Sequence, residues 1–212
     1  MRIHDEYETM RKLGEGFSIA RFGDGEEKLM RGADAVREPK NPKLAAELME
    51  VLQSPHERCL RGVLRPNNGP KNESLMRYAP GLYRYMDPAQ EYWSAHISRA
   101  DHCPWMDTKE YAELAHALWR GKRAAAIAET PLVSTYRAVS LTAREVIHIS
   151  CPHRETYAVI DEIEAAAVSA KPDIVVMAAG PAATCLANRL SKRGIQALDF
   201  GRIGSLIVRN SD

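Results

Sequence analysis

Two carboxylates separated by one glycine, Asp24 and Glu26 around Gly25, have the residue types and spacing best suited to chemistry in this chain. They follow a segment predicted to be a strand, so they lie where a strand-end loop is expected. Because the glycine allows backbone turns that other residues resist, the two side chains can converge on one hard cation, Mn²⁺ or Mg²⁺. Such a cation keeps coordination positions open for phosphate oxygens and water. The alternative interpretation is an ordinary acidic turn.

Two neighbouring features suit an anionic ligand. Arg21 places a permanent planar cation just before the turn, as diphosphate binding requires, although an ion pair with Asp24 or Glu26 is the alternative. The segment Gly180-Pro181-Ala182-Ala183-Thr184 predicts a second strand-end turn that opens a helix, whose free N–H groups face an anion. Ordinary turn chemistry is its alternative. Neither segment completes a dinucleotide-binding glycine motif or a P-loop.

One further cluster has metal-ligand residue types. It contains His96, Asp101, His102 and Cys103, but no second ligand pair accompanies it. We therefore interpret it as a loop with satisfied side chains. The chain also lacks a G-x-S-x-G nucleophile elbow and any recognisable cysteine nucleophile signature, so the sequence gives no support for a hydrolase of those classes.

The elements that must position these residues are clearest in the last third of the chain. Strand, helix, strand, helix and strand alternate there, which predicts right-handed crossovers and a mostly parallel sheet flanked by helices, a Rossmann-like α/β fold. A loop is expected at 65–72. The predicted strands are 17–22, 146–149, 173–179 and 195–200. One predicted helix begins at Glu26, and the others cover 43–53, 73–86, 108–120, 156–170 and 181–193.

Composition narrows the class of protein. The chain has 212 residues, of which 45% are hydrophobic, and its 29 Lys and Arg nearly balance its 28 Asp and Glu. These values predict a single domain over 1–212 and exclude a nucleic-acid partner or a polybasic membrane partner. The acidic start of the chain, the lack of an apolar run of about 18 residues and four cysteines without a C-x-x-C pair predict a cytoplasmic protein with no transmembrane segment. A homo-oligomer is compatible with these features.

From residue 18 to residue 26, Ser-Ile-Ala-Arg-Phe-Gly-Asp-Gly-Glu, the sequence resembles the GT-D fold glycosyltransferases, a bacterial family first known as a domain of unknown function. The similarity extends over nearly the whole chain in the same order. It recurs at 96–99, from 149 to 163, and most clearly from 179 to 201.

The resemblance implies a metal-dependent hexosyltransferase on a Rossmann-like domain. The metal, usually manganese, is held at the D-x-E motif, here Asp24 and Glu26, with Arg21 and Gly23 beside it. The sugar comes from a nucleotide sugar, typically a uridine diphosphate sugar, and passes to a glycan or glycoconjugate acceptor. The turn from Gly180 to Thr184 resembles the family's second strand-end loop and is expected to hold the donor.

The predicted mechanism is electrostatic. A cation on the two acids neutralises charge on the departing nucleotide, and Arg21 shares that role. No general base is singled out among Asp101, Glu129 and Asp199. Two alternatives stay open: a metal-dependent phosphohydrolase, which usually has more acids or histidines, and a non-catalytic nucleotide- or glycan-binding module. One feature favours the binding module: this chain has Gly201-Arg202-Ile203-Gly204 where the family commonly has a glycine-histidine-isoleucine-aspartate run.

Overall fold

The computed structural model describes residues 1–65, 79–98, 107–131 and 134–201. Within these ranges, eight strands form one sheet, in which all the paired strands are parallel. This arrangement confirms the predicted α/β class. In sheet order the strands are β1 (Arg2–Ile3), β4 (Glu91–Ser94), β3 (Cys59–Val63), β2 (Ser18–Arg21), β8 (Gln196–Asp199), β7 (Ile174–Ala178), β5 (Arg123–Ala128) and β6 (Glu145–Ser150).

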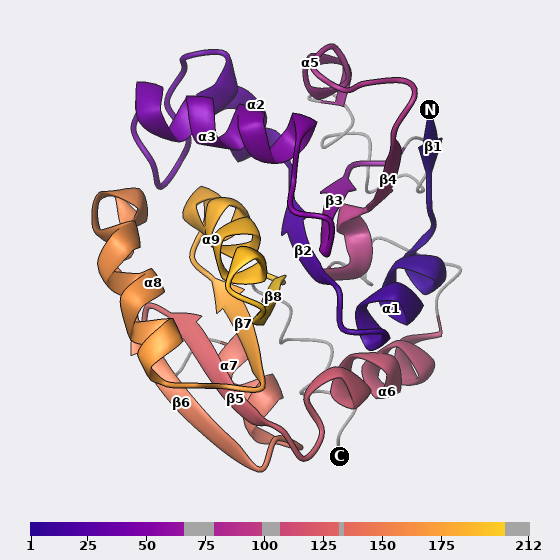
Figure 1. Ribbon diagram of the computed structural model, residues 1–212, viewed down its shortest axis with the longest axis vertical. Helices are drawn as coiled ribbons and strands as arrows, with labels where there is room; N and C mark the ends of the chain where they lie inside the picture. The colour runs from indigo at the N-terminus through magenta and orange to yellow at the C-terminus, as the bar shows by residue number, and fades with distance from the viewer. Residues whose placement is uncertain (66–78, 99–106, 132–133, 202–212) are drawn as a thin grey trace.

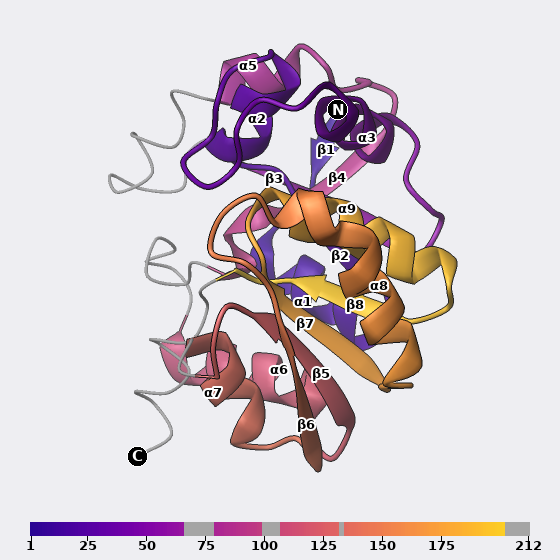
Figure 2. The ribbon, with the colours of Figure 1, turned by 90° about the vertical axis from the view of Figure 1, so that its left-hand side faces the viewer.

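Helices cover both faces of the sheet, as Figures 1 and 2 show. On one face α3 (Pro42–Gln53) and α8 (Ile160–Ser169) pack against α9 (Pro181–Lys192), and α2 (Asp24–Met30) packs on α3. On the other face α6 (Thr108–Trp119) contacts both α1 (Glu6–Gly14) and α7 (Ser134–Ser140). The remaining described helices are α5 (Ala79–Tyr83), which contacts α2, and the 3₁₀ turns η2 (Ala95–Ser98) and η4 (Thr156–Val159).

Each face of the sheet has its own hydrophobic core. In β7, Val175 and Met177 join the core beneath α3 and α9, whereas Ile174 and Val176 join the core beneath α1 and α6. Successive side chains of a strand point to opposite faces, so a strand covered on both sides must be apolar at every position. This explains the continuous apolar run that identified β7 in the sequence.

Most predicted elements are confirmed, with differences at their ends. The helix expected from Glu26 begins at Asp24, because Gly23 is the N-cap and the Glu26 side chain accepts a hydrogen bond from the Gly23 N–H. The helix expected from 156 to 170 begins instead with η4 and becomes α-helical at Ile160. Within the predicted helix 73–86 the described residues form α5. Of the predicted loop 65–72, only Arg65 is described.

The topology creates a binding position at the carboxyl edge of the sheet. From the carboxyl end of β7 the chain continues through α9 to β8 on one side, whereas from the neighbouring β5 it continues through α7 to β6 on the other, so the strand order changes direction between β7 and β5. Ligands of open α/β sheets bind outside the carboxyl ends of strands where the strand order changes direction in this way. Within the residues that the structure describes, none of the helices has the length and apolar character needed to cross a membrane.

Candidate active site

Arg21 and Asp199 end two adjacent strands, β2 and β8, and form an ion pair at the carboxyl edge of the sheet. Arg21 Nη2 lies 3.3 Å from Asp199 Oδ1, and the Arg21 backbone N–H donates to Oδ2 at 3.3 Å. The Arg21 Nε also donates to the Asp199 carbonyl oxygen. Burial raises the pKa of Asp199, and the adjacent guanidinium partly offsets that effect. Arg21 therefore forms an ion pair, as its alternative interpretation expects, but its partner is Asp199 and not Asp24 or Glu26.

The first turn of α9 lies against this pair. The buried Thr184 hydroxyl donates to the Arg21 carbonyl at 2.9 Å and lies 3.4 Å from Asp199 Oδ2. Gly180, the N-cap, has a φ of 60°, a left-handed conformation that favours glycine, and Pro181 takes the first helical position. A Cβ at Gly25 would lie 3.5 Å from Pro181 Cγ. The tertiary structure thus brings the two predicted strand-end segments together.

Glu26 faces the inside of this arrangement. Its Oε2 accepts a hydrogen bond from the Gly23 N–H at 2.8 Å. Burial and the negative charge of Asp199 raise the pKa of Glu26 to about 7, against the lowering effects of backbone hydrogen bonds and of Arg21. Glu26 and Asp199 therefore compete for the positive charge of one guanidinium.

Asp24 has different surroundings. Its side chain is 41% exposed, and Oδ2 lies 3.1 Å from Lys28 Nζ, one helical turn along α2. Gly25 has no left-handed φ and belongs to the first turn of α2, so the prediction that it provides an unusual backbone turn is wrong. Residues two apart in a helix do not face each other. The two carboxylates accordingly have different partners, Lys28 for Asp24 and the Gly23 N–H for Glu26.

Asp24 and Glu26 fit a divalent cation only if a bound diphosphate supplies further oxygen ligands. Among the described residues there is no group of three or more His, Cys, Asp or Glu arranged to hold a metal. Mg²⁺ commonly uses one or two carboxylates together with substrate phosphates and water, and Asp24 and Glu26 supply donors of that type. The residues present therefore fit a cation that is bound together with a diphosphate.

Of the other cluster with metal-ligand residue types, the described residues include only His96. His96 is buried in η2, where its backbone N–H donates to the Ser94 hydroxyl at 3.1 Å. Asp101, His102 and Cys103 lie outside the described residues.

Sequence reasoning missed two features of the carboxyl edge. The sequence indicates Asp199 only as one of three carboxylates among which no general base is singled out, although its position at the end of a predicted strand also makes it a possible partner for Arg21. The second is a contact of 2.8 Å between Glu129 Oε2 and His153 Nδ1, after β5 and β6. The sequence offered little signal for it, because β5 was not predicted.

Comparison with known proteins gives one consistent result. A family model described as "Glycosyltransferase GT-D fold" matches residues 19–206. "Probable glycosyl transferase Gly" from Streptococcus gordonii is 28% identical over 222 residues, covering 91% of this chain. The chain spans only 30% of the length of that relative.

Solved structures extend this similarity to the fold. One, described as "The highly conserved domain of unknown function 1792 has a distinct glycosyltransferase fold", has a TM-score of 0.85 at 25% identity, over 100% of this chain and 82% of that one. Another, "A New Glycosyltransferase (DUF1792) from Streptococcus sanguinis", has a TM-score of 0.79 at 25% identity, over 97% of this chain and 83% of that one.

Proposed function

The chain belongs to the GT-D fold glycosyltransferase family, and from this premise we propose that it transfers a hexose from a nucleotide sugar to a hydroxyl group of a glycan or glycoconjugate. The proposed donor is a uridine diphosphate hexose. In this reaction the bond between the anomeric carbon and the diphosphate oxygen breaks, its electron pair leaves with the nucleotide, and the acceptor oxygen forms the new glycosidic bond.

One observation carries the proposal: Arg21 and the amino terminus of α9 lie together at the carboxyl edge of the sheet, and α9 begins next to the point where the strand order changes direction. The leaving nucleoside diphosphate gains negative charge, and oriented positive groups that meet this charge lower the barrier. The α9 terminus contributes the positive end of a helix dipole. The ion pair with Asp199 orients the Arg21 guanidinium, which has five N–H donors.

We extend the proposal to a divalent cation, Mn²⁺ or Mg²⁺, held by Asp24 and Glu26. The raised pKa of Glu26 supports this extension: burial and the negative charge of Asp199 both disfavour the charged carboxylate, and a nearby cation would favour it. When bound, such a cation supplies charge neutralisation at the diphosphate. Lys28 competes with such a cation for the charge of Asp24, so we expect metal and donor to bind together rather than metal alone.

The test measures binding and turnover separately. Nucleotide sugars are screened with Mn²⁺ for a rise in melting temperature, since a ligand that binds only the native state stabilises it. Sugar transfer and donor hydrolysis are then measured with and without chelator in the wild type and in Asp24→Asn. The matched control is Glu162→Gln, an exposed carboxylate of α8.

Three outcomes decide between the parts of the proposal. Turnover that needs Mn²⁺ or Mg²⁺ and falls in Asp24→Asn, but not in the control, supports it. Equal turnover with chelator in both variants rejects the metal. Failure of every nucleotide sugar to react rejects the transferase.

The pairing of Asp24 with Lys28 favours one second candidate, a module that binds the nucleotide without turnover. The Asp24 carboxylate already has a cationic partner in Lys28 Nζ. Calorimetric titration with uridine diphosphate that shows binding, without release of sugar from any donor, would support this candidate. Release of inorganic phosphate from generic phosphoesters would instead indicate the phosphohydrolase alternative.

A further inference from the structure

Glu129 and His153 form a carboxylate–histidine pair that the proposed function has not used. Glu129 follows β5, His153 follows β6, and their side chains are 39% and 52% exposed. With the Nδ1–H donating to Glu129 Oε2 over 2.8 Å, the neutral imidazole keeps Nε2 as its proton acceptor. No hydrogen-bond partner of Nε2 occurs among the described residues. Accessibility, orientation by a carboxylate and a vacant acceptor nitrogen are the properties of a general base.

The strand register places this pair beside the donor-binding turn. Ala128, the last residue of β5, is paired with Ala178 of β7 on one side and Ser150 of β6 on the other. Glu129 is therefore level with the residue that precedes Gly180, the N-cap of α9. Neighbouring strands are about 4.8 Å apart. A sugar whose diphosphate lies at the α9 terminus is within reach of the loops after β5 and β6.

An independent set of contacts ties the His153 loop to the D-x-E turn. The Glu155 N–H donates to the Arg37 carbonyl at 2.9 Å, and the Tyr157 N–H donates to the buried Glu38 carboxylate at 3.0 Å. Ala35, in the same segment, has its Cβ 3.9 Å from a Cβ built at Gly25. One segment between α2 and α3 thus contacts both loops.

The backbone around His153 is also constrained. Glu155 has a φ of 57°, a left-handed conformation that is uncommon for residues other than glycine. Such conformations persist only where surrounding contacts hold them, and they occur often at functional sites.

We propose that His153 is the general base for the acceptor hydroxyl and that Glu129 is the residue that positions it. The inference rests on the proposed transferase. As the acceptor oxygen bonds to the anomeric carbon, its proton moves to His153 Nε2, and the electron pair of the breaking bond leaves with the nucleoside diphosphate. The imidazolium then returns the proton to solvent, and Glu129 stabilises it while it is charged.

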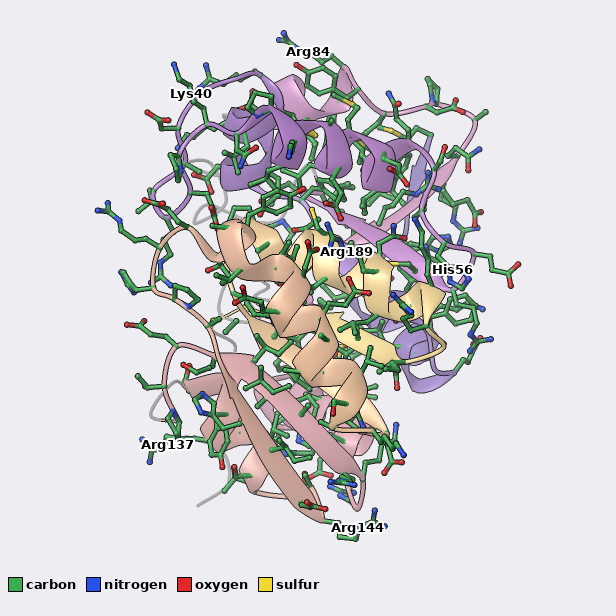
Figure 3. The ribbon with its side chains drawn as sticks, turned by 60° about the vertical axis from the view of Figure 1, so that its left-hand side comes forward. Lys40, His56, Arg84, Arg137, Arg144 and Arg189 are labelled. Atoms are coloured by element: carbon green, nitrogen blue, oxygen red, sulfur yellow. The ribbon has the colours of Figure 1, made fainter. Side chains whose placement is uncertain are left out.

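The test compares sugar transfer with donor binding. In His153→Gln, we expect kcat for transfer to fall by about 10²- to 10⁴-fold, while the calorimetric Kd for uridine diphosphate changes less than about threefold. The control is His56→Gln. His56 precedes β3, so it lies at the amino ends of the strands, away from the carboxyl edge, and Figure 3 shows it beside α9. It should retain wild-type transfer.

Two further variants separate chemistry from structure. In His153→Ala, added imidazole should restore part of the lost transfer, which a purely structural role would not allow. Glu129→Gln keeps an oxygen that accepts the Nδ1–H and should lose less activity than Glu129→Ala. If the wild type transfers sugar and His153→Gln keeps transfer within about threefold, His153 is not the base, although the transferase stands. A wild type that transfers no sugar overturns the proposed function itself.

Discussion

The guanidinium of Arg21 and the carboxylate of Asp199 join the last residues of two adjacent parallel strands, with Nη2 3.3 Å from Oδ1. The two side chains are 19% and 6% exposed, so neither is well solvated. Thr184 adds a hydrogen bond to the Arg21 carbonyl at 2.9 Å. The pair therefore fixes β2, β8 and the start of α9 relative to one another, at the place where we expect the donor diphosphate.

Removal of Arg21 should destabilise the fold as well as donor binding. In Arg21→Met, Asp199 keeps its burial but loses its positive partner, and uncompensated buried charge is costly. We expect the free energy of unfolding to fall by about 3 kcal/mol, measured by urea denaturation. Arg144→Met is the control, because Arg144 is 66% exposed and lies 3.7 Å from Asp173, which is also exposed. Equal losses in both variants would contradict a special role of the Arg21–Asp199 pair.

Substitution of Gly25 tests whether this residue has an ordinary helical backbone or a backbone conformation that only glycine adopts. Gly25 lies in the first turn of α2 without a left-handed φ, and an added Cβ would make an ordinary 3.5 Å contact with Pro181. Gly25→Ala should therefore keep or raise stability, by up to about 1 kcal/mol. The larger, branched Gly25→Val should push against Pro181 and lower it by about 1–3 kcal/mol. Thermal unfolding measures both, and a strongly destabilised alanine variant would show that the glycine is needed for its backbone.

The raised pKa of Glu26 predicts a pH-dependent stability. The folded state holds this proton up to about pH 7, whereas the usual pKa is 4.5, so the folded state binds more protons than the unfolded state between these values. The contribution of Glu26 to stability therefore falls as pH rises from 4.5 through 7. In Glu26→Gln, which keeps an acceptor for the Gly23 N–H, this loss disappears.

The measurement is unfolding free energy against pH, with chelator present throughout. Glu26→Gln should match the wild type near pH 4 and exceed it by about 2 kcal/mol at pH 8. A constant difference across this range would mean that Glu26 titrates normally.

Arg189 connects three helices on one face of the sheet, α9, α3 and α8. Figure 3 shows it on α9 next to α8. Its Nε and Nη2 contact the two carboxylate oxygens of Glu47 at 2.6 and 2.7 Å, and its Nη1 contacts Asp161 at 2.6 Å. Arg189→Lys keeps the charge but cannot form the two-pronged contact. We expect a loss of about 1–2 kcal/mol, measured by thermal unfolding.

Arg193→Lys is the comparison for this prediction. Arg193 follows the last residue of α9 but is 62% exposed, and among the described residues its side chain has one ion pair, 3.3 Å from Glu164. Its replacement should change stability by less than about 0.5 kcal/mol. A similar loss in both variants would indicate that charge, rather than the geometry of the Arg189 contact, matters.

Local patterns were sufficient for about half of the elements. The apolar run of β7, the Gly180-Pro181 helix start and the spacing of apolar residues in α3 all express local chemistry, and each is confirmed. β5 was missed because it contains four alanines, which favour helix. β3 was missed because it carries Arg61 and Gly62. Burial against neighbouring strands overrides those local preferences, and no local pattern reveals it.

The sequence by itself determined the family, the α/β class and the two strand-end segments that begin α2 and α9, because each follows from residues close together in the chain. Only the tertiary structure decided that Arg21 pairs with Asp199, 178 positions away, and that Glu129 meets His153. Partner choice depends on which strand ends become neighbours in the sheet. The sheet order is set by the packing of both cores as a whole, and therefore by no single segment.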